Sequence, residues 1–371
     1  METNISACSF TENVTTEQDA EGYKYSTGEV IYTLGFLPFI ISIGVVDNLA
    51  FIFVVSRVPR MHTSTNCYLI NLALADILFL TTGTVEKLYR YSQSPIHGDD
   101  TPIKNGGCVW IYLVSDTSYY AALFFVSLVS IERYCAVCTP QNRYIFNKKK
   151  TYVLVSVSWI LSLCLALTQI PSTSVFLKIC LRWPNGRFKV HLPDSWGICT
   201  AVHPWIRMYA NGMQTIPFFI AMVLNSAMYI KIVGGLNDSL NRLKSHSGGT
   251  TETDARMRDQ IARMLVINGI AFFSCLAPFE ILSLLNVTED NFIDTDVFTS
   301  LVYAARALAY INCAINPIIY TIMSQRYRYA FHQTFLQKRK KRHITAQSCT
   351  MKFLGSTTQD QLRTTVCESR I

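Results

Sequence analysis

Seven long apolar stretches constrain the fold of this 371-residue chain more than any other feature of its sequence. A helix needs about 20 consecutive apolar residues to cross the hydrocarbon core of a bilayer. Such stretches lie at about 30–56, 66–90, 107–138, 152–174, 204–234, 261–286 and 297–322. Only 16% of the residues are charged, whereas soluble domains carry about 25%. We therefore expect an all-α membrane protein in which residues 30–322 form a bundle of seven transmembrane helices, with 66–90 and 297–322 as the weaker spans.

The segments outside the bundle are short and leave no room for a separate soluble domain. Residues 1–29 form a polar N-terminal tail, and residues 323–337 are expected to form an amphipathic helix along the inner membrane surface. Three aromatic residues of that segment share one helix face because they are four positions apart: Tyr327, Phe331 and Phe335. The tail at 338–371 is rich in Lys and Arg and then in Ser and Thr, so we expect it to be disordered.

The distribution of basic residues indicates the orientation of the chain. Lys and Arg concentrate in the segments after the first, third, fifth and seventh spans, and segments of this kind remain in the cytoplasm. We therefore expect a multi-pass protein of the plasma membrane with an extracellular N-terminus, where the sequons at Asn4 and Asn13 would carry glycans. The net charge of +8 does not predict a nucleic-acid partner, because the basic residues are divided among separate segments.

The longest outer loop, residues 175–203, predicts a β-hairpin over the outer mouth of the bundle. Asn185-Gly186 separates two apolar, alternating runs, Val175–Leu181 and Phe188–Leu192, and Asn-Gly between such runs is a strong hairpin signal. Four cysteines would face the oxidising exterior, where disulfides form: Cys8, Cys108, Cys180 and Cys199.

Polar residues inside the apolar stretches carry the strongest functional signal. A charged side chain at the bilayer centre costs about 2.5–3.5 kcal/mol on insertion scales, so each one needs a structural or functional reason. The distinctive positions are Asn48, Asp76, Glu132-Arg133-Tyr134, Trp159, Pro278 and Asn316-Pro317-Ile318-Ile319-Tyr320. Any one of them could be a buried packing feature. Together, in this order and in six different stretches, they resemble the class A (rhodopsin-like) G protein-coupled receptors over residues 30–337.

This resemblance implies a transducing role for residues of the inner half. Arg133, between Glu132 and Tyr134, would restrain helix 6 at rest and contact a heterotrimeric G protein in the active state. Tyr229 and Tyr320 would form the tyrosine pair that rearranges on activation. The proline kinks of helices 6 and 7 would lie at Pro278 and Pro317.

The resemblance also implies a cation site and a disulfide. Asp76, Asn312 and Asn316 would hold an allosteric sodium ion, since oxygen ligands suit a hard cation. Cys108 would pair with a cysteine of the long loop, and Cys199 fits that place better than Cys180. The chain departs from the family pattern at Leu276, where tryptophan is usual, and at Ala122, where a hydroxyl is usual.

Several segments indicate that the ligand is a neuropeptide. Aminergic receptors carry an aspartate where this chain has Ser115, so a small amine is not expected. Asp116 and Cys275–Phe279 resemble the neuromedin U and ghrelin receptors, whereas Arg306 and the segment Tyr310–Tyr320 resemble the thyrotropin-releasing hormone receptors. Both groups bind short peptides.

Charges of both signs are expected near the outer mouth. Arg306 shares a helix face with Tyr310 and Pro317 and so points into the bundle. A cavity with both signs suits a mixed-charge ligand, and alternatively Arg306 pairs internally with Glu86 or Asp116 and holds helices together. The candidate ligand contacts are Arg306, Asp116, Glu86, Tyr310, Glu280, Phe279 and Tyr120.

The resemblance implies the remaining partners. We expect a G protein of the Gq type with calcium mobilisation, arrestin at a phosphorylated tail, and a PDZ protein at Ser369-Arg370-Ile371. A class A receptor for a non-peptide ligand, a constitutively active orphan and a membrane transporter are the alternatives. The transporter is disfavoured because the sequence lacks repeats with matched broken helices. Neither enzyme activity nor a cofactor other than the allosteric sodium ion is expected.

Overall fold

The computed structural model describes residues 8–139, 147–184, 192–245, 250–285 and 295–335, without side chains for 239–256 and 295–296. The chain divides into two units, 1–336 and 337–371, and every described residue belongs to the first. Three predicted features lie outside the described residues: the sequon at Asn4, the turn at Asn185-Gly186 and the tail at 338–371.

The described chain is mostly helical. The helices are α1 (Glu17–Gly22), α2 (Thr27–Ile31), α3 (Leu37–Arg57), α4 (Ser64–Gln93), α5 (Lys104–Cys138), α6 (Lys148–Gln169), α8 (Pro204–Ser245), α9 (Thr250–Leu285), α10 (Thr295–Met323) and α11 (Gln325–Phe335). A π-helical turn, Tyr32–Phe36, joins α2 to α3, and short 3-10 turns lie at Pro59–Met61 and Ile170–Ser172. The strands are β1 (Phe10–Asn13), β2 (Val175–Arg182) and β3 (Ser195–Thr200).

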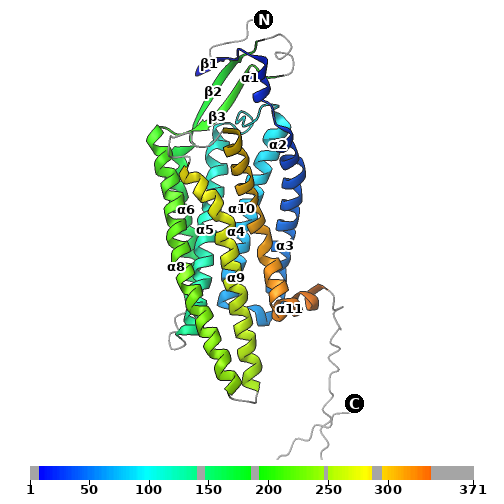
Figure 1. The fold of residues 1–371 in the computed structure, drawn as a ribbon, viewed down its shortest axis with the longest axis vertical. Coiled ribbons are helices and arrows are strands. Elements are labelled where there is room, and N and C mark those ends of the chain that lie inside the picture. The colour runs from blue at the N-terminus through cyan, green and yellow to red at the C-terminus, as the bar shows by residue number, and fades with distance from the viewer. Residues whose placement is uncertain (1–7, 140–146, 185–191, 246–249, 286–294, 336–371) are drawn as a thin grey trace, which may run out of the picture. The chain divides into compact units, whose positions relative to one another are not determined.

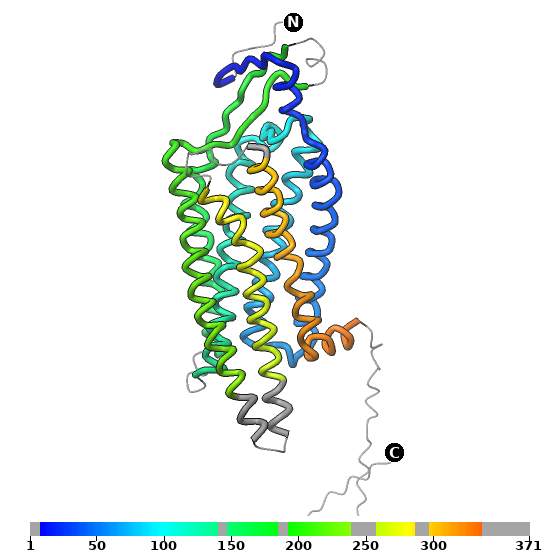
Figure 2. Tube along the Cα trace, viewed as in Figure 1, coloured from blue at the N-terminus to red at the C-terminus, as the bar shows by residue number. Residues whose placement is uncertain are grey.

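Seven helical spans within the described residues are long and apolar enough to cross a membrane. They are Thr27–Arg57, Ser64–Gln93, Lys104–Cys138, Lys148–Ser172, Pro204–Asp238, Met257–Leu285 and Val297–Met323. The predicted seven-helix bundle is therefore confirmed (Figure 1). We call the end of the bundle that carries the N-terminal segment the outer end, and the end that carries α11 the inner end (Figure 2).

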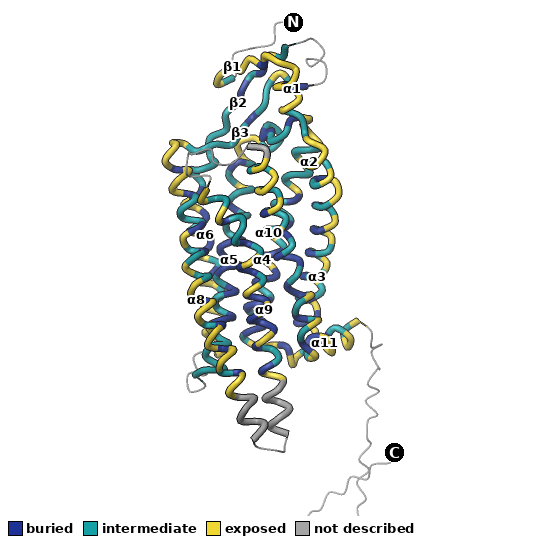
Figure 3. Tube along the Cα trace, in the orientation of Figure 1, coloured by how far each residue is buried: buried dark blue, intermediate teal, exposed yellow. Residues whose placement is uncertain are grey.

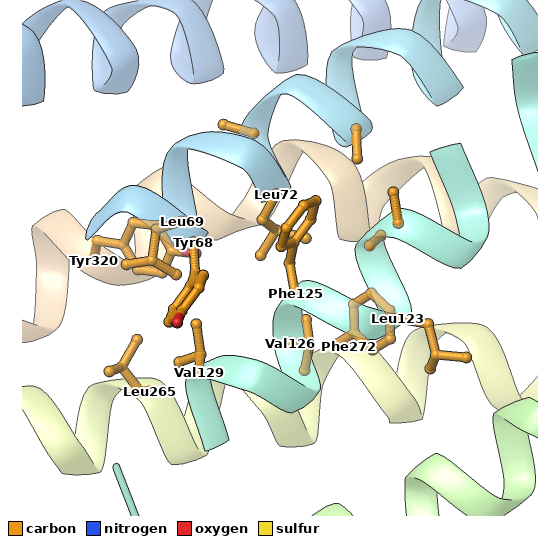
Figure 4. Close-up of a cluster of buried hydrophobic side chains, with 14 of the residues drawn as sticks. Tyr68, Leu69, Leu72, Leu123, Phe125, Val126, Val129, Leu265, Phe272 and Tyr320 are labelled. Carbon is orange, nitrogen blue, oxygen red and sulfur yellow. The ribbon is translucent and has the colours of Figure 1, made fainter. Parts of the chain in front are cut away.

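The bundle is apolar on both its inside and its outside. Buried side chains from α4, α5, α9 and α10 point toward one another, among them Tyr68, Phe125, Phe272 and Tyr320 (Figure 4). Exposed residues run along the outside of the bundle (Figure 3), and many of them are large and apolar, such as Ile230, which is 75% exposed. An exposed apolar surface around a packed core is expected of helices that face lipid.

Helix α11 begins two residues after the end of α10 and packs on the inner end of α3. Tyr327 and Ala330 are buried against the bundle. Phe335 is exposed, and its ring lies 5.9 Å from the ring of Phe53. One apolar face is thus covered by the bundle while its edge remains free for lipid.

A three-stranded sheet with the order β1-β2-β3 lies at the outer end. β2 and β3 are antiparallel, with Val175 opposite Thr200, and confirm the predicted hairpin. The second strand is Ser195–Thr200, after the expected run at Phe188–Leu192, most of which lies outside the described residues. β1 comes from the N-terminal tail and pairs in parallel with β2.

The N-terminal segment therefore carries regular structure that was not predicted. A disulfide joins Cys8 to Cys180 of β2, with the Cα atoms 5.7 Å apart. Thr16 caps α1 by accepting a hydrogen bond from the Asp19 backbone N–H. A small apolar core then forms under the sheet, from Val14, Ala20, Ile96, Leu181 and Leu192. We call residues 8–25 together with β2 and β3 the outer cap.

Candidate ligand site and transducer site

Arg306 lies in the outer half of α10, and its guanidinium faces the ring of Phe279 on α9, with 5.9 Å between its Cζ and the ring centroid. Within the described residues it forms no ion pair. Glu86, one of its two proposed internal partners, is instead bonded to the guanidinium of Arg90. Asp116, the other, likewise forms no ion pair in the described chain. The internal pairing of Arg306 is therefore not found in this arrangement, and the guanidinium remains able to receive a ligand group.

Glu280 of α9 is fully buried and joins three helices. Its Oε1 accepts hydrogen bonds from the hydroxyl of Tyr119 on α5 (2.8 Å) and from Nε2 of Gln214 on α8 (3.2 Å). Its second oxygen has no hydrogen-bond partner among the described residues. Neither Tyr119 nor Gln214 was identified from the sequence.

Two of the predicted ligand contacts have partners inside the bundle. The hydroxyl of Tyr120 donates to the carbonyl of Met213 (3.1 Å) and accepts from Nε2 of Gln169 (3.0 Å), so it links α5 to α8 and α6. Tyr310 is buried between α10 and α4, where a Cβ added at Gly83 would stand 2.6 Å from its hydroxyl. Both tyrosines therefore help to set the spacing of the helices in this arrangement.

Arg90, which sequence reasoning missed, is the centre of an ionic cluster at the outer end of α4. Its guanidinium bonds to Glu86 one turn earlier, to Oδ1 of Asp100 at 2.5 Å and to the hydroxyl of Tyr112 at 3.4 Å. Oδ2 of Asp100 in turn accepts the backbone N–H of Cys199 at 2.6 Å. Burial raises the pKa of the Asp100 carboxyl, and the nearby Arg90 acts in the opposite direction. The one sequence signal was the four-residue spacing of Glu86 and Arg90 on a helix.

Glu29 makes a second link at the outer end. Its Oε1 accepts the hydroxyl of Tyr303 on α10 at 2.8 Å and lies 2.9 Å from Nδ1 of His97. Tyr303 precedes Arg306 by one helical turn, so the two side chains lie on neighbouring parts of one helix face. The N-terminal segment therefore reaches the helix that carries Arg306.

Cys108 at the start of α5 is bonded to Cys199 of β3, with 5.5 Å between the Cα atoms. This is the pairing that the resemblance implied. Asn13 lies exposed in β1, where its side chain is accessible to a glycan.

Arg133 lies at the inner end of α5 beside a cavity of about 390 Å³. Its Nη2 donates to Oε1 of Glu132 (3.1 Å) and to the hydroxyl of Thr65 on α4 (2.6 Å). Within the described residues, none of its hydrogen bonds goes to α9, which is the sixth membrane-spanning helix. The restraint of helix 6 that the resemblance implied is therefore not made by a hydrogen bond of Arg133 in this structure. The neighbouring Tyr134 ring lies 5.8 Å from the ammonium of Lys231 on α8.

The two tyrosines of the implied pair have different surroundings. The hydroxyl of Tyr229 accepts from Ser130 on α5 (2.9 Å) and donates to Oδ1 of Asn225 (3.4 Å). The ring of Tyr320 packs between Phe51 and Tyr327, at 5.3 and 5.7 Å between centroids. The hydroxyl of Tyr320 is buried without a hydrogen-bond partner in the described chain. Pro278 and Pro317 lie inside α9 and α10, as the sequence required.

Asp76 is buried in the middle of the bundle, where its Oδ2 accepts Nδ2 of Asn316 at 2.7 Å. A cavity of about 20 Å³ adjoins it, lined by Asp76, Ser118, Asn312 and Cys313 among others. The side-chain carbonyl oxygens of Asn312 and Asn316 are buried and have no hydrogen-bond partner among the described residues. Of the three residues that the resemblance implied as cation ligands, Asp76 and Asn312 line this cavity, whose other walls are mostly apolar. A carboxylate and an amide oxygen are the kind of ligand that a small hard cation takes.

Comparison with known proteins places these features in one family. The family model described as "7 transmembrane receptor (rhodopsin family)" matches residues 47–320. Neuromedin-U receptor 2 of Mus musculus is 27% identical over 327 residues, covering 86% of this chain and 75% of the relative. A neuromedin U receptor homolog of Caenorhabditis elegans is 29% identical, covering 84% and 81%. Growth hormone secretagogue receptor type 1 of Sus scrofa is 24% identical, covering 78% and 76%.

Proposed function

Because the chain belongs to the rhodopsin family of seven-transmembrane receptors, as a class A G protein-coupled receptor of the neuropeptide group, we propose that it binds an extracellular peptide at its outer end and activates a heterotrimeric G protein at its inner end. The relatives are named for neuromedin U and for growth hormone secretagogues, and a ligand of that chemical class is proposed for this chain. The receptor lies in the plasma membrane with the N-terminus outside, and Asn13 is accessible there for glycosylation.

The observation that carries the peptide proposal is the pair of opposite charges, Arg306 and Asp116, that form no ion pair within the described residues. A charged side chain inside a bundle is costly unless it has a partner. A peptide that offers both a carbonyl or carboxylate and a basic group would supply partners of both signs. The guanidinium provides a planar fork of donors suited to two-point contact with such an oxygen.

The test begins with a screen of transfected cells for calcium release against a library of neuropeptides that includes neuromedin U and ghrelin. With the active peptide, Arg306→Lys keeps the charge and loses the fork, so potency should fall about tenfold, or about 1.4 kcal/mol. Arg306→Ala should reduce potency further while high peptide concentrations restore the maximal response. Arg207 is an exposed arginine at the outer end of α8, and Arg207→Ala serves as the matched control with unchanged potency.

Two results would contradict this proposal. Normal potency of Arg306→Ala at normal surface expression would remove Arg306 from the ligand site. A purified receptor that transports solute in liposomes and activates no G protein would remove the receptor function altogether.

We assign the G protein to the Gq type on the resemblance to the neuropeptide receptors alone. Arg133 beside the inner cavity is the residue proposed to contact it. Arg133→Ala should reduce calcium release with surface expression retained. A cyclic-AMP response without calcium release would replace Gq by another G protein.

Asp76, Asn312 and Asn316 are the residues that would hold a sodium ion, which would supply a compact positive charge between α4 and α10. The side-chain oxygens of Asn312 and Asn316, which have no hydrogen-bond partner among the described residues, support this assignment. Ala122 beside the cavity removes one possible hydroxyl ligand. If the ion binds, agonist affinity should depend on sodium concentration in the wild type and lose that dependence in Asp76→Asn.

The tail at 338–371 is proposed to recruit arrestin after phosphorylation and to present Ser369-Arg370-Ile371 to a PDZ domain. Truncation after Lys341 should slow internalisation. Unchanged internalisation of the truncated receptor would remove both partners.

A further inference from the structure

Gly269 lies in the middle of α9, opposite the side chain of Tyr229 on α8. A Cβ atom built on Gly269 would overlap the hydroxyl and the Cζ atom of Tyr229 and would stand 3.0 Å from its Cε2. Glycine weakens a helix interior relative to alanine, so a glycine at this place needs a packing reason. The close approach of the Tyr229 ring supplies that reason.

The ring of Tyr229 is held on its other side by α5. Its hydroxyl accepts a hydrogen bond from Ser130 at 2.9 Å, and the side chain is buried. Ser130 and Gly269 therefore define a slot between α5 and α9 that the tyrosine fills from α8. The slot exists only while the backbone of α9 at Gly269 stays against the ring.

Within the described residues, Arg133 makes no ionic contact with α9. The hydrogen bonds of Arg133 within the described residues go to Glu132 and Thr65, on α5 and α4. The side chain of Tyr229 thus links the inner half of α9 to α5. Its ring lies so close to the backbone of α9 that residue 269 can have no side chain.

We propose that Gly269 is a positioning residue for signalling, because its bare backbone admits Tyr229 between α5 and α9 and so stabilises the resting arrangement of α9. A resting state exists only if the chain is a receptor, so this proposal rests on the proposed function, whereas the contact between Gly269 and Tyr229 does not. A methyl group at position 269 would force the tyrosine out of the slot and destabilise this arrangement relative to any in which α9 has moved away. A two-state equilibrium shifts toward the arrangement that the substitution destabilises less.

The experiment uses the full-length receptor in lipid nanodiscs with purified Gq, Gs and Gi heterotrimers and no added ligand. Gly269→Ala should raise basal nucleotide exchange about threefold or more over the wild type. Gly212→Ala, in α8, is the matched control, because its nearest neighbour would lie at an ordinary 3.9 Å. Helix propensity alone predicts the same small stabilisation for both variants, so an effect of Gly269→Ala alone isolates the contact with Tyr229.

A double-mutant cycle identifies that contact. In a Tyr229→Leu background the slot is no longer filled by an aromatic ring, so Gly269→Ala should leave basal exchange unchanged. If Gly269→Ala reaches the membrane poorly, Tyr229→Leu should restore its surface expression. Failure of Tyr229→Leu to suppress either effect would overturn the proposal.

A direct probe separates this proposal from the receptor function. With 3-fluorotyrosine at position 229, Gly269→Ala should shift the fluorine resonance toward that of a solvent-accessible tyrosine, and Gly212→Ala should leave it in place. An unshifted resonance, or unchanged basal exchange in an active receptor, would overturn the role of Gly269. Absence of exchange with every G protein, even after addition of the peptide found in the calcium screen, would instead contradict the proposed function, and the resonance would still decide the inference.

Discussion

At the outer end of the bundle, disulfides and ion pairs join segments that are far apart in the chain. At the inner end, the ion pair of Arg133 lies within α5, and the described links between helices are hydrogen bonds and close packing. Two disulfides tie β2 and β3 to the N-terminal segment and to α5. Arg90 and Glu29 add buried polar links between the outer loops and helices α4 and α10. At the inner end the corresponding contacts are the Tyr229 slot and the ring packing of Tyr320.

This difference separates a fixed end from a movable one. Removing one partner of a buried ion pair strands the other charge at a cost of about 3–5 kcal/mol, so such links hold one geometry. A packed tyrosine can exchange one set of neighbours for another, and packed interfaces of this kind switch between discrete arrangements. The outer end is thus preorganised for a ligand, and the inner end is able to change shape.

The largest expected effect is the loss of the link between the cap and the bundle. Cys108→Ser should remove most of the surface expression, since loss of a native disulfide costs about 2–5 kcal/mol. Cys180→Ser should be milder, because β1 and the cap core also hold the N-terminal segment. Flow cytometry of an epitope-tagged receptor measures both.

Cys8→Ser is the matched control for Cys180→Ser, because the two cysteines form one bond. The single variants and the double variant should have equal surface expression. A Cys180→Ser receptor as poorly expressed as Cys108→Ser would contradict the ranking of the two disulfides.

The next effect concerns the ionic cluster. Arg90→Ala should lower the stability of the receptor by about 1–3 kcal/mol, because it leaves the buried Asp100 without its cation, whereas Glu86 keeps its ion pair with Lys87. The Arg90 side chain is 12% exposed, whereas the Lys24 side chain in the Glu21 pair is 39% exposed. Lys24→Ala should therefore change stability by less than about 1 kcal/mol. Thermal unfolding in detergent checks both, and equal melting temperatures for the two variants would remove the distinction between the ends.

The smallest effect has the opposite sign and lies at the inner end. Asn268 of α9 is buried, and its Oδ1 has no hydrogen-bond partner among the described residues. Asn268→Leu removes this unsatisfied group and should raise stability by about 1 kcal/mol in the same unfolding assay. A lower melting temperature would show that the amide has a partner that stabilises the resting bundle.

The extent of the bundle could be predicted closely from the sequence because hydropathy is a local property. Each span needs only its own apolar residues, so the predicted stretch at 204–234 and the observed span Pro204–Asp238 agree to within a few residues. The hairpin was predicted from a local turn signal, yet its second strand lies at Ser195–Thr200. Alternation alone did not distinguish that strand from the run just before it.

The links between distant segments were decided by tertiary structure. Cys180 had several possible partners by composition, and only the pairing of β1 with β2 brings Cys8 to it. Arg90 had a visible partner in Glu86, but the bond to Asp100 depends on how the outer loop folds over α4. Gly269 carried no signal at all, because nothing in α9 itself indicates that a tyrosine of α8 lies against its backbone.

The sequence by itself determined the membrane-spanning helices, the family to which they belong and the charged residues that enter the outer half. These follow from residue type and spacing, which act within one helix. The tertiary structure decided which of those charges are paired, which cysteines join and which glycine admits a neighbouring ring. Such outcomes depend on distances of a few ångström between helices far apart in the chain, and no periodicity within one helix encodes them.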